Sequence, residues 1–444
     1  MSDTIYTLSS AAGRAAVAVI RISGPGAGIS IHNLTALPVP VPRQASLRKI
    51  KMPGTEQIID EGLVIFFPGP GSATGEDLVE FQVHGGRAVI QAIFDALATF
   101  DGFRPAEPGE FARRGFDNGK IDLTTAEGIA DLIDSETQAQ RRQAQIQAGG
   151  TMAVLYDTWR SELLQAQTLV EAAIDFSDEG DVSEKAYQGA SDIVRTLSET
   201  ITKHLEGARG GEIIRSGFRV VIAGPPNAGK SSLLNTLAKR DVAIVSDEAG
   251  TTRDAIEVHL DLDGFLVVMT DTAGIRAASS KIEQEGIRRT LEHARIADLI
   301  LWMQDGTRKS LENIPAELKG IESMNIINKS DLLDECSINN ISKDTIAISA
   351  KTGVGVEELI SAIVTTARQS MTTMDQVVPT NARHARHLSQ AAKQLGTFLQ
   401  SGMSDLELRA EDLRMAASEL GRLTGRIDVE DILDQIFLRF CVGK

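Results

Sequence analysis

One eight-residue segment limits what this chain can fold into more than any other. It reads Gly224-Pro-Pro-Asn-Ala-Gly-Lys-Ser231, follows the apolar run 218–223 and leads into a segment of helical character. A glycine-rich turn between a strand and a helix aims backbone N–H groups at the helix N-terminus, where they bind phosphate. The sequence therefore predicts a nucleotide-binding α/β domain built on a parallel sheet.

Most residues of this phosphate loop have an expected role. Lys230 would neutralise charge on the β and γ phosphates and take part in catalysis, and the Ser231 hydroxyl would bind Mg²⁺, which prefers oxygen ligands. The remaining expected nucleotide contacts here are Gly224, Asn227, Ala228 and Gly229 of the loop and Ser232 directly after it. The alternative is a glycine-rich turn that only caps a helix, and the strand before it and the helix after it disfavour that alternative.

Two further segments indicate that the base is guanine. Asn328-Lys329-Ser330-Asp331 ends an apolar run, and the Asp331 carboxylate can accept both N–H donors on the edge of guanine. Adenine offers no such pair of donors, so ATP is disfavoured as the ligand. Ser349-Ala350-Lys351, after another β-like run, is expected to complete the base pocket.

Two segments between these motifs are typical of the γ-phosphate side of a GTPase. Asp271-Thr272-Ala273-Gly274 ends a strand, so Asp271 would hold Mg²⁺ through water and Gly274 would let the backbone approach the γ-phosphate. Thr251-Thr252 lies where the first switch segment belongs, with Thr252 as an expected metal ligand. Five such motifs in this order predict an enzyme that binds and hydrolyses GTP.

The residues that would drive hydrolysis are harder to identify. Ras-like enzymes place a water-orienting Gln directly after the motif that ends at Gly274, but Ile275 stands there, and an alkyl group cannot orient water. Glu283 is a candidate for that task, and a solvated carboxylate at a helix start is the alternative. No arginine finger can be assigned, so another cation is needed. The Asn227 carbonyl oxygen is a candidate ligand for that cation, unless Asn227 only shapes the loop.

Length and composition restrict the remaining choices. A chain of 444 residues is expected to form two or three domains. Its net charge of −16 disfavours indiscriminate binding to nucleic acid or anionic lipid. The two cysteines, Cys336 and Cys441, have a spacing that suggests neither a disulfide framework nor a Cys-based zinc site. With no export signal and no apolar run of about 18 residues, we expect a cytoplasmic protein that does not enter a membrane.

Changes of pattern divide the chain into four segments. Residues 1–118 mix β-rich runs at 15–22, 63–67 and 78–84 with a helical stretch at 88–100, which predicts an α+β domain. Residues 119–213 and 374–444 carry apolar residues at helical spacing, over 155–174, 193–205, 388–399 and 406–420. Residues 214–373 alternate strands, at 218–223, 265–270, 299–303, 325–328 and 345–349, with helices from 229, at 281–297 and at 356–366. We therefore expect a multidomain α/β protein, in which a doubly wound, Ras-like α/β domain is inserted into one discontinuous helical domain.

Motifs outside the nucleotide site make the sequence resemble a known family. They are Arg21-Ile-Ser, Thr74-Gly-Glu-Asp-Leu-Val-Glu80, His84-Gly-Gly86, Pro108-Gly-Glu-Phe111, Lys120-Ile-Asp-Leu, Gly250-Thr-Thr-Arg-Asp254 and the terminal Cys441-Val-Gly-Lys444. With the phosphate loop, they resemble the three-domain tRNA-modification GTPases of the MnmE family, also called TrmE, over essentially the whole chain. One mild departure is Val442, where the family often has another branched apolar residue.

The resemblance implies a reaction and its partners. With an FAD-dependent partner, MnmG (GidA), such a protein adds an aminomethyl-type group, such as carboxymethylaminomethyl, to C5 of the wobble uridine of certain tRNAs. The carbon would come from a tetrahydrofolate derivative in the 5,10-methylene or 5-formyl form, bound by Arg21, Glu80 and Lys120. The resemblance also implies a homodimer joined through the N-terminal domains, so residues 1–118 would both bind folate and dimerise.

The resemblance implies roles for the remaining site residues too. Asn227 and the segment Ser246-Asp247-Glu248-Ala249-Gly250-Thr251 would form a potassium site, with Asn227, Ser246, Glu248 and Thr251 as metal ligands. Glu283 would orient the attacking water, and Arg276 belongs to the same switch segment. Cys441 would take part in the modification chemistry, and Lys444 in cofactor binding.

Without the resemblance, some of these residues have a plainer explanation. Arg21 and Lys120 are ordinary surface cations, and Cys441 is an inert free thiol unless its surroundings favour the thiolate. Glu80, in a strand-like run, needs donors from a ligand such as a pterin or from an internal partner. Short basic clusters are usually solvated, so the partner protein is expected to supply much of the contact with tRNA phosphates. These clusters are Arg113-Arg114, Arg141-Arg142 and Arg383-His-Ala-Arg386-His387.

A rival hypothesis is a GTPase switch for ribosome assembly that binds rRNA. Such proteins usually append a small RNA-binding module to the GTPase domain, whereas here the α/β segment interrupts a helical one and the tail ends in Cys441-Val-Gly-Lys444. That arrangement favours tRNA modification. The sequence leaves open which tRNAs are modified, whether glycine or ammonium is the amine donor, and how GTP hydrolysis is coupled to the chemistry.

Overall fold

The structure, a computed structural model, describes residues 3–427 apart from 12, 179, 241, 245–256, 272–294, 309–312, 319, 335–340, 343, 372–376 and 404. It separates into two compact units. The first comprises Met1–Ala130, Gln147–Leu164 and Ala417–Lys444, and the second comprises Asp131–Ile146 and Gln165–Ala416. The limits of the four segments inferred from the sequence remain a prediction.

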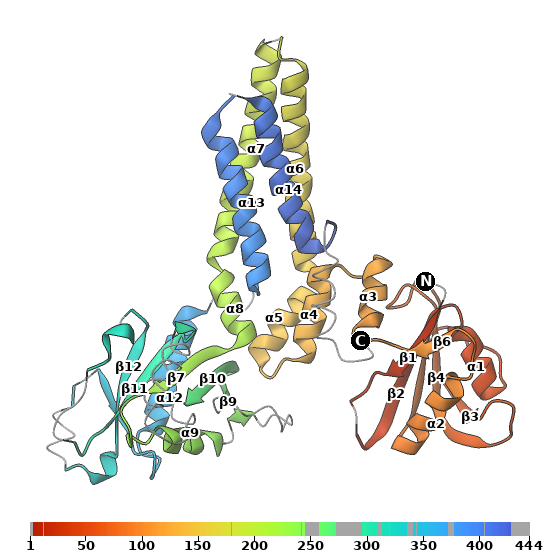
Figure 1. The fold of residues 1–444 in the computed structure, drawn as a ribbon, viewed down its shortest axis with the longest axis horizontal. Coiled ribbons are helices and arrows are strands. Elements are labelled where there is room, and N and C mark those ends of the chain that lie inside the picture. The colour runs from red at the N-terminus through yellow and green to blue at the C-terminus, as the bar shows by residue number, and fades with distance from the viewer. Residues whose placement is uncertain are drawn as a thin grey trace, which may run out of the picture. The chain divides into compact units, whose positions relative to one another are not determined.

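The first unit contains a six-stranded sheet with the strand order β3-β4-β5-β2-β1-β6 (Figure 1). Its strands are β1 (Thr4–Leu8), β2 (Ala15–Ser23), β3 (Ser46–Lys51), β4 (Ile58–Phe67), β5 (Leu78–Gly85) and β6 (Phe103–Pro105). Neighbours are antiparallel except β1 and β6, which are parallel. The α+β character and the predicted strands at 15–22, 63–67 and 78–84 are confirmed.

Two helices cover one face of this sheet. They are α1 (Ala27–Thr35) and α2 (Arg87–Leu97), which confirms the helix predicted at 88–100. Alternate residues of β2 and β5, such as Ile20, Ile22 and Phe81, are buried against Ile31 of α1 and Ile93 of α2. The intervening residues of these strands face the other side, because side chains alternate along a strand. That other side therefore carries Arg21 and Glu80.

The second unit contains a seven-stranded sheet with the order β13-β12-β11-β7-β10-β9-β8. Its strands are β7 (Phe218–Ala223), β8 (Ala243–Ile244), β9 (Glu257–Leu262), β10 (Phe265–Asp271), β11 (Leu299–Asp305), β12 (Ser323–Asn328) and β13 (Thr345–Ala347). The five strands from β13 to β10 are parallel, and β9 and β8 add an antiparallel edge. The first strand, β7, lies between β10 and β11, so the chain order reverses there. Ligands of doubly wound sheets bind at the carboxyl ends of the strands beside such a reversal.

Most predicted elements of the α/β segment are confirmed. The helices α9 (Lys230–Ala238) and α12 (Val356–Ser370) flank the sheet, and the five predicted strands are present. The sheet core is formed by fully buried residues such as Val220, Leu233, Met269, Leu301 and Leu359. The helix predicted at 281–297 lies largely outside the described residues, whereas β8 and β9 were not predicted.

Apart from the first of them, which lies in the N-terminal segment 1–118 and was not predicted, the remaining helices confirm the helical spacing of the flanking segments. They are α3 (Glu110–Asp117), α4 (Leu123–Ile133), α5 (Gln138–Ala148), α6 (Thr151–Asp175), α7 (Gly180–Glu206), α8 (Ala208–Ser216), α13 (Ala382–Ser401) and α14 (Leu406–Thr424). In the second unit, α7 precedes the α/β sheet and packs on α13, which follows it. The Tyr187 hydroxyl donates to the Gly402 carbonyl at 2.7 Å, and the Tyr187 ring lies 5.5 Å from that of Phe398. The sheet is thus inserted between two helices that pack together.

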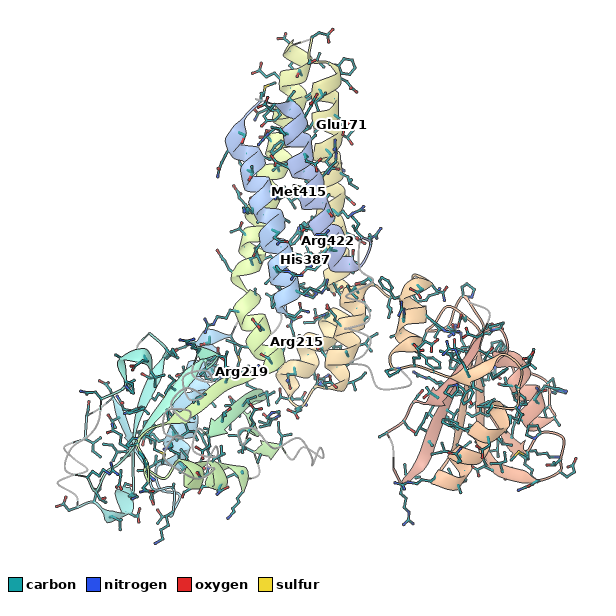
Figure 2. All side chains as sticks on the ribbon, in the orientation of Figure 1. Glu171, Arg215, Arg219, His387, Met415 and Arg422 are labelled. Carbon is teal, nitrogen blue, oxygen red and sulfur yellow. The ribbon has the colours of Figure 1, made fainter. Side chains whose placement is uncertain are left out.

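The chain enters and leaves the α/β sheet at neighbouring points. Arg215 stands near the end of α8 and Arg219 near the start of β7 (Figure 2). An ion pair of 2.7 Å joins Arg215 to Asp131. On the preceding turn of α8, a Cβ at Gly211 would overlap the carbonyl oxygen of Pro379 in the returning segment. The outgoing and incoming segments therefore lie against each other at this glycine.

Among the residues that the structure describes, none of the helices combines the length and the apolar character needed to cross a membrane.

Candidate functional site

The phosphate loop lies at the carboxyl end of β7. Two of its positions require glycine, because the backbone there has a positive φ and lies close to the neighbouring strands. Gly224 has φ +145° and Gly229 has φ +97°, values that favour glycine. A Cβ at Gly224 would overlap the Met303 carbonyl of β11, and one at Gly229 would overlap the Asn328 side chain of β12. Asn227 also has a positive φ, of +65°, which Asn tolerates better than most residues. The loop is therefore held close to the sheet edge.

Lys230 lies over this loop. Its ammonium group donates to the carbonyl oxygens of Gly224 at 2.8 Å and Pro225 at 3.0 Å, and its side chain is buried. Carbonyls are neutral acceptors, so a phosphate oxygen in the loop would be a stronger partner for this cation. The geometry fits the predicted role of Lys230 beside the phosphates.

Ser231 and Asp271 bring two oxygen ligands together from different elements. The Ser231 hydroxyl, at the start of α9, donates to Asp271 Oδ2 at 2.6 Å. Asp271 ends β10 and is 1% exposed. A hydroxyl and a carboxylate are the donors that a hard cation such as Mg²⁺ prefers, either directly or through water. The two residues therefore fit the magnesium site predicted for them.

Asn328 connects the phosphate loop to the predicted base pocket. Its amide nitrogen donates to the Ala228 carbonyl at 2.8 Å, and its amide oxygen accepts from the Ala350 backbone N–H at 2.9 Å. The Thr236 hydroxyl of α9 donates to the Ala350 carbonyl at 2.7 Å. Asn328 thus aligns three nucleotide segments, which is a more specific role than the general base contact expected from the sequence.

The remaining base residues lie on turns at the same sheet edge. Asp331 is exposed in a 3₁₀ turn (Ser330–Leu332), where its carboxylate is accessible to a base. Ser349 is buried, and its hydroxyl accepts the Thr352 backbone N–H at 3.1 Å, which shapes the turn that carries exposed Lys351. These turns bring the two predicted base segments to one sheet edge.

Sequence reasoning missed Asp305. Lys329 pairs with it at 2.5 Å. Partial burial alone would raise the pKa of Asp305, but hydrogen bonds from Lys329 and Thr307 outweigh it and lower that pKa. Asp305 ends β11 as Asp271 ends β10, so the signal available in the sequence was a carboxylate at the end of an apolar strand.

The structure brings two of the three predicted folate residues together. Arg21 on β2 and Glu80 on β5 are direct partners in the strand register, and their side chains form an ion pair of 2.9 Å. Glu80 therefore has the internal partner that was one of its two alternatives. No hydrogen bond or ion pair joins Lys120 to either residue within the described part of the chain. Lys120 instead lies beside Gly75, where a Cβ would be 3.2 Å from Lys120 Cε.

The basic clusters differ in their surroundings. Arg114 is 1% exposed and pairs with carboxylates, so the explanation of it as a solvated cation is wrong. The reason is that α3 turns this residue inward, onto Glu110 of the same helix and onto Asp3 and Glu76 from distant segments. Arg141 is exposed and bonds to Gln138 and Gln145 of its own helix, as a solvated residue does.

Several predicted site residues lie outside the described residues. They are Ser246, Asp247, Glu248, Ala249, Gly250, Thr251, Thr252, Thr272, Ala273, Gly274, Arg276, Glu283, Cys441 and Lys444. Their roles remain predictions.

Comparison with known proteins bears on the whole chain. A family model described as "GTP-binding protein TrmE N-terminus" matches residues 4–120, and one described as "MnmE helical domain" matches residues 123–441. The chain belongs to the MnmE family. The match to the MnmE helical domain spans the α/β sheet and the helices on both of its sides.

Full-length relatives agree with the MnmE assignment. A "tRNA modification GTPase MnmE" of Parvibaculum lavamentivorans is 48% identical and covers 100% of both chains. One of Paramagnetospirillum magneticum is 47% identical, again over 100% of both, and one of Agrobacterium fabrum is 46% identical over 100% of this chain and 99% of its own. The resemblance seen in the sequence is thereby confirmed as membership of the MnmE family.

Proposed function

We propose that this protein hydrolyses GTP in the course of tRNA modification. The main observation behind the proposal is the hydrogen bond between Ser231 and Asp271. It joins the phosphate loop to the end of β10, which is the strand that leads to the γ-phosphate side of the site. The names of the relatives support tRNA modification over the alternative of a ribosome-assembly switch.

In the proposed reaction, each described residue has one task. Asp331 selects guanine through its carboxylate. Lys230 exchanges the loop carbonyls for phosphate oxygens, and Ser231 and Asp271 hold Mg²⁺. When bound, the metal supplies positive charge that stabilises the charge developing on the transferred phosphoryl group.

We propose that K⁺ supplies the positive charge that an arginine finger gives in other GTPases. Asn227, whose positive φ serves the conformation of the loop, would also contribute its side-chain oxygen. The other proposed ligands are Ser246, Glu248 and Thr251. Replacing K⁺ by Na⁺ should slow turnover by about 10-fold or more, because a smaller ion cannot fill a site built for a larger one without moving its ligands. Steady-state rates in matched KCl and NaCl test this expectation, and equal rates would refute it.

Glu283 is proposed to orient the attacking water, with Arg276 in the same switch segment. Glu283→Ala should reduce hydrolysis by about 100-fold or more and leave GTP affinity nearly unchanged, because the lost contact exists only on the way to the transition state. Single-turnover rates and nucleotide titrations measure the two quantities separately. A large loss of affinity would point instead to a role in folding.

The modification itself is proposed to need a flavoprotein partner, MnmG. Together the two proteins would add an aminomethyl or carboxymethylaminomethyl group to C5 of the wobble uridine. The carbon would come from a tetrahydrofolate derivative bound beside the Arg21–Glu80 pair and Lys120. Cys441 and Lys444 would serve this chemistry at the end of the chain, and two copies would associate through residues 1–118.

Reconstitution tests the proposed function. The protein, the flavoprotein partner, unmodified tRNA, 5,10-methylenetetrahydrofolate, an amine donor and GTP are combined, and the nucleosides are analysed by mass spectrometry. We expect modified wobble uridine with GTP and a greatly reduced yield with a non-hydrolysable GTP analogue. Modification at the same rate without GTP would contradict the proposal. Supplying glycine or ammonium in separate reactions identifies the amine donor.

A further inference from the structure

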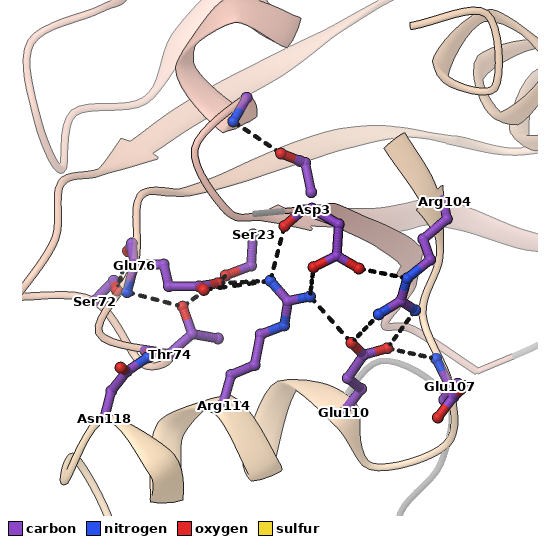
Figure 3. A network of polar contacts seen from close by, with 12 residues as sticks. Asp3, Ser23, Ser72, Thr74, Glu76, Arg104, Glu107, Glu110, Arg114 and Asn118 are labelled. Atoms are coloured by element: carbon purple, nitrogen blue, oxygen red, sulfur yellow. Dashed lines mark hydrogen bonds and ion pairs between the residues drawn. The ribbon is translucent and has the colours of Figure 1, made fainter. Parts of the chain in front are cut away.

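A network of polar contacts joins α3 to the segment before β5 and, through Glu76, to the end of β2 in the first unit (Figure 3). Its centre is the Arg114 guanidinium of α3, which is 1% exposed. We call it the Arg114 hub. Its members are Asp3, Ser23, Thr74, Glu76, Arg104, Glu110, Arg114 and Asn118.

The charged part of the hub connects segments far apart in the sequence. Arg114 bonds to Asp3 at 3.0 Å, to Glu76 at 3.0 Å and to Glu110 at 3.1 Å. Arg104 bonds to the Asp3 and Glu110 carboxylates, at 2.6 Å to each. Burial acts to raise the pKa of Asp3 and of Glu110, but bonds from the two arginines outweigh it and lower both. Asp3 and Glu110 are therefore ionised at neutral pH, and charge-assisted hydrogen bonds hold this part of the hub together.

One branch of the hub reaches the strands that carry the Arg21–Glu80 pair. The Ser23 hydroxyl donates to Glu76 Oε2 at 2.8 Å and lies 2.7 Å from the Thr74 hydroxyl. Ser23 is two residues beyond Arg21 on β2, and Glu76 is four residues before Glu80 of β5. The ends of the two paired strands are thus attached to Arg114.

A second branch reaches Lys120. The Asn118 side-chain amide donates to the Thr74 carbonyl at 2.7 Å. Gly75 has φ +78°, and a Cβ there would lie 2.7 Å from Asn118 Cβ and 3.2 Å from Lys120 Cε. The segment from Thr74 to Glu76 therefore touches both Lys120 and the strand ends.

The composition of the hub argues for a task besides stability. Buried ion pairs often contribute no more stability than apolar side chains of similar size, because removing charges from water is costly. Directly beside the hub, apolar packing of Ile5, Leu78 and Phe111 already holds the same elements together. Hydrogen bonds, unlike apolar contacts, define direction as well as distance.

We propose that the Arg114 hub is a positioning device, which holds Lys120 and the Arg21–Glu80 pair in one fixed arrangement for the proposed folate. The inference rests on the proposed function. The hub residues orient Arg21, Glu80 and Lys120 and do not themselves contact the folate, so they are positioning residues. Thr74 belongs to both branches. Its hydroxyl contacts the Ser23 hydroxyl on the branch to the strands, and its carbonyl accepts from Asn118 on the branch to Lys120.

A matched pair of substitutions at Thr74 tests the inference in the full-length protein. Thr74→Val keeps the shape of this buried side chain and removes the hydroxyl, whereas Thr74→Ser keeps the hydroxyl. The probe is 5-formyltetrahydrofolate, with its Kd measured by equilibrium dialysis. We expect the Kd to rise about 10-fold in Thr74→Val and to stay within about 2-fold of the wild type in Thr74→Ser. The GTP hydrolysis rate should be unchanged in both, since the nucleotide residues belong to the other compact unit.

If Thr74→Val does not fold, Asn118→Ala tests the same inference. Asn118 is exposed, so its removal breaks the Lys120 branch without opening the core, and the Kd should rise several-fold. Lys120→Ala removes a proposed folate contact and is the positive control, so it should weaken binding. If it does, unchanged binding in Asn118→Ala and in any folded Thr74→Val would overturn the inference. A wild-type protein that does not bind the probe would overturn the proposed folate site and the positioning role with it.

Discussion

Asp331→Asn is expected to weaken GTP binding by about 100- to 1,000-fold and to improve binding of xanthosine triphosphate. The carboxylate accepts two N–H groups of guanine, and hydrogen bonds to a charged group contribute about 1.5–3 kcal/mol each. Xanthine carries a carbonyl where guanine carries its amino group, so an asparagine amide can donate to it. Because a change in selectivity requires contact with the base, this outcome would separate base recognition from loss of folding.

Asp331→Asn is expected to change base binding without disturbing the neighbouring turns. Asp331 is exposed, and its neighbours Asn328 and Lys329 are held independently, by Ala228 and Asp305. Asp344→Asn, another exposed carboxylate near the same sheet, is the matched control and should leave both affinities unchanged. Competition against a fluorescent GTP analogue measures them. A loss of affinity without any change in the ratio of the two nucleotides would contradict the proposed role of Asp331.

Ser231→Ala is expected to lower kcat for GTP hydrolysis by about 100-fold or more. The substitution removes one proposed ligand of Mg²⁺ and leaves Asp271 without the hydroxyl that now donates to it at 2.6 Å. The charge on the phosphoryl group would then be stabilised less in the transition state. The Mg²⁺ concentration for half-maximal rate should rise at the same time, which a simple folding defect would not cause.

A magnesium titration of the hydrolysis rate measures both effects of Ser231→Ala. Ser361→Ala on α12 is the control, because that exposed serine lies on another helix of the same unit and donates to the Glu357 carbonyl of its own helix. It should behave as the wild type does. A variant Ser231→Ala with normal kcat and normal magnesium dependence would remove Ser231 from the metal site.

Local signals were enough to predict the centre of the α/β sheet. β7 and the loop after it were predicted because an apolar run, a glycine-rich turn and a helix start occur in immediate succession. β9 was missed although its residues alternate, because it directly follows the segment read as a switch loop. β8 has only two residues, Ala243–Ile244, and its strand character comes from pairing with β9. Edge strands of this kind depend on their partner more than on their own sequence.

The sites show the same division between local and distant information. Gly229 and Ser231 could be assigned from the motif alone, whereas the bond from Asn328 to Ala228 joins residues 100 positions apart. Arg114 was read as a solvated cation because it stands next to Arg113 in a short basic cluster, and such clusters are usually solvated. A spacing of four residues from Glu110 was the only local hint, since its other acidic partners lie 38 and 111 residues away. Such pairings follow from the tertiary fold and not from any short window of sequence.

Nucleoside analysis of tRNA tests the central claim most directly. The gene is deleted, and the strain is complemented with the wild type or with Ser231→Ala. We expect the wobble uridines of the affected tRNAs to lose their C5 group in the deletion strain, to regain it with the wild type and to remain unmodified with Ser231→Ala. Wobble uridines that stay fully modified in the deletion strain would contradict a role in tRNA modification. Full restoration by a Ser231→Ala protein that does not hydrolyse GTP would contradict the link between hydrolysis and modification.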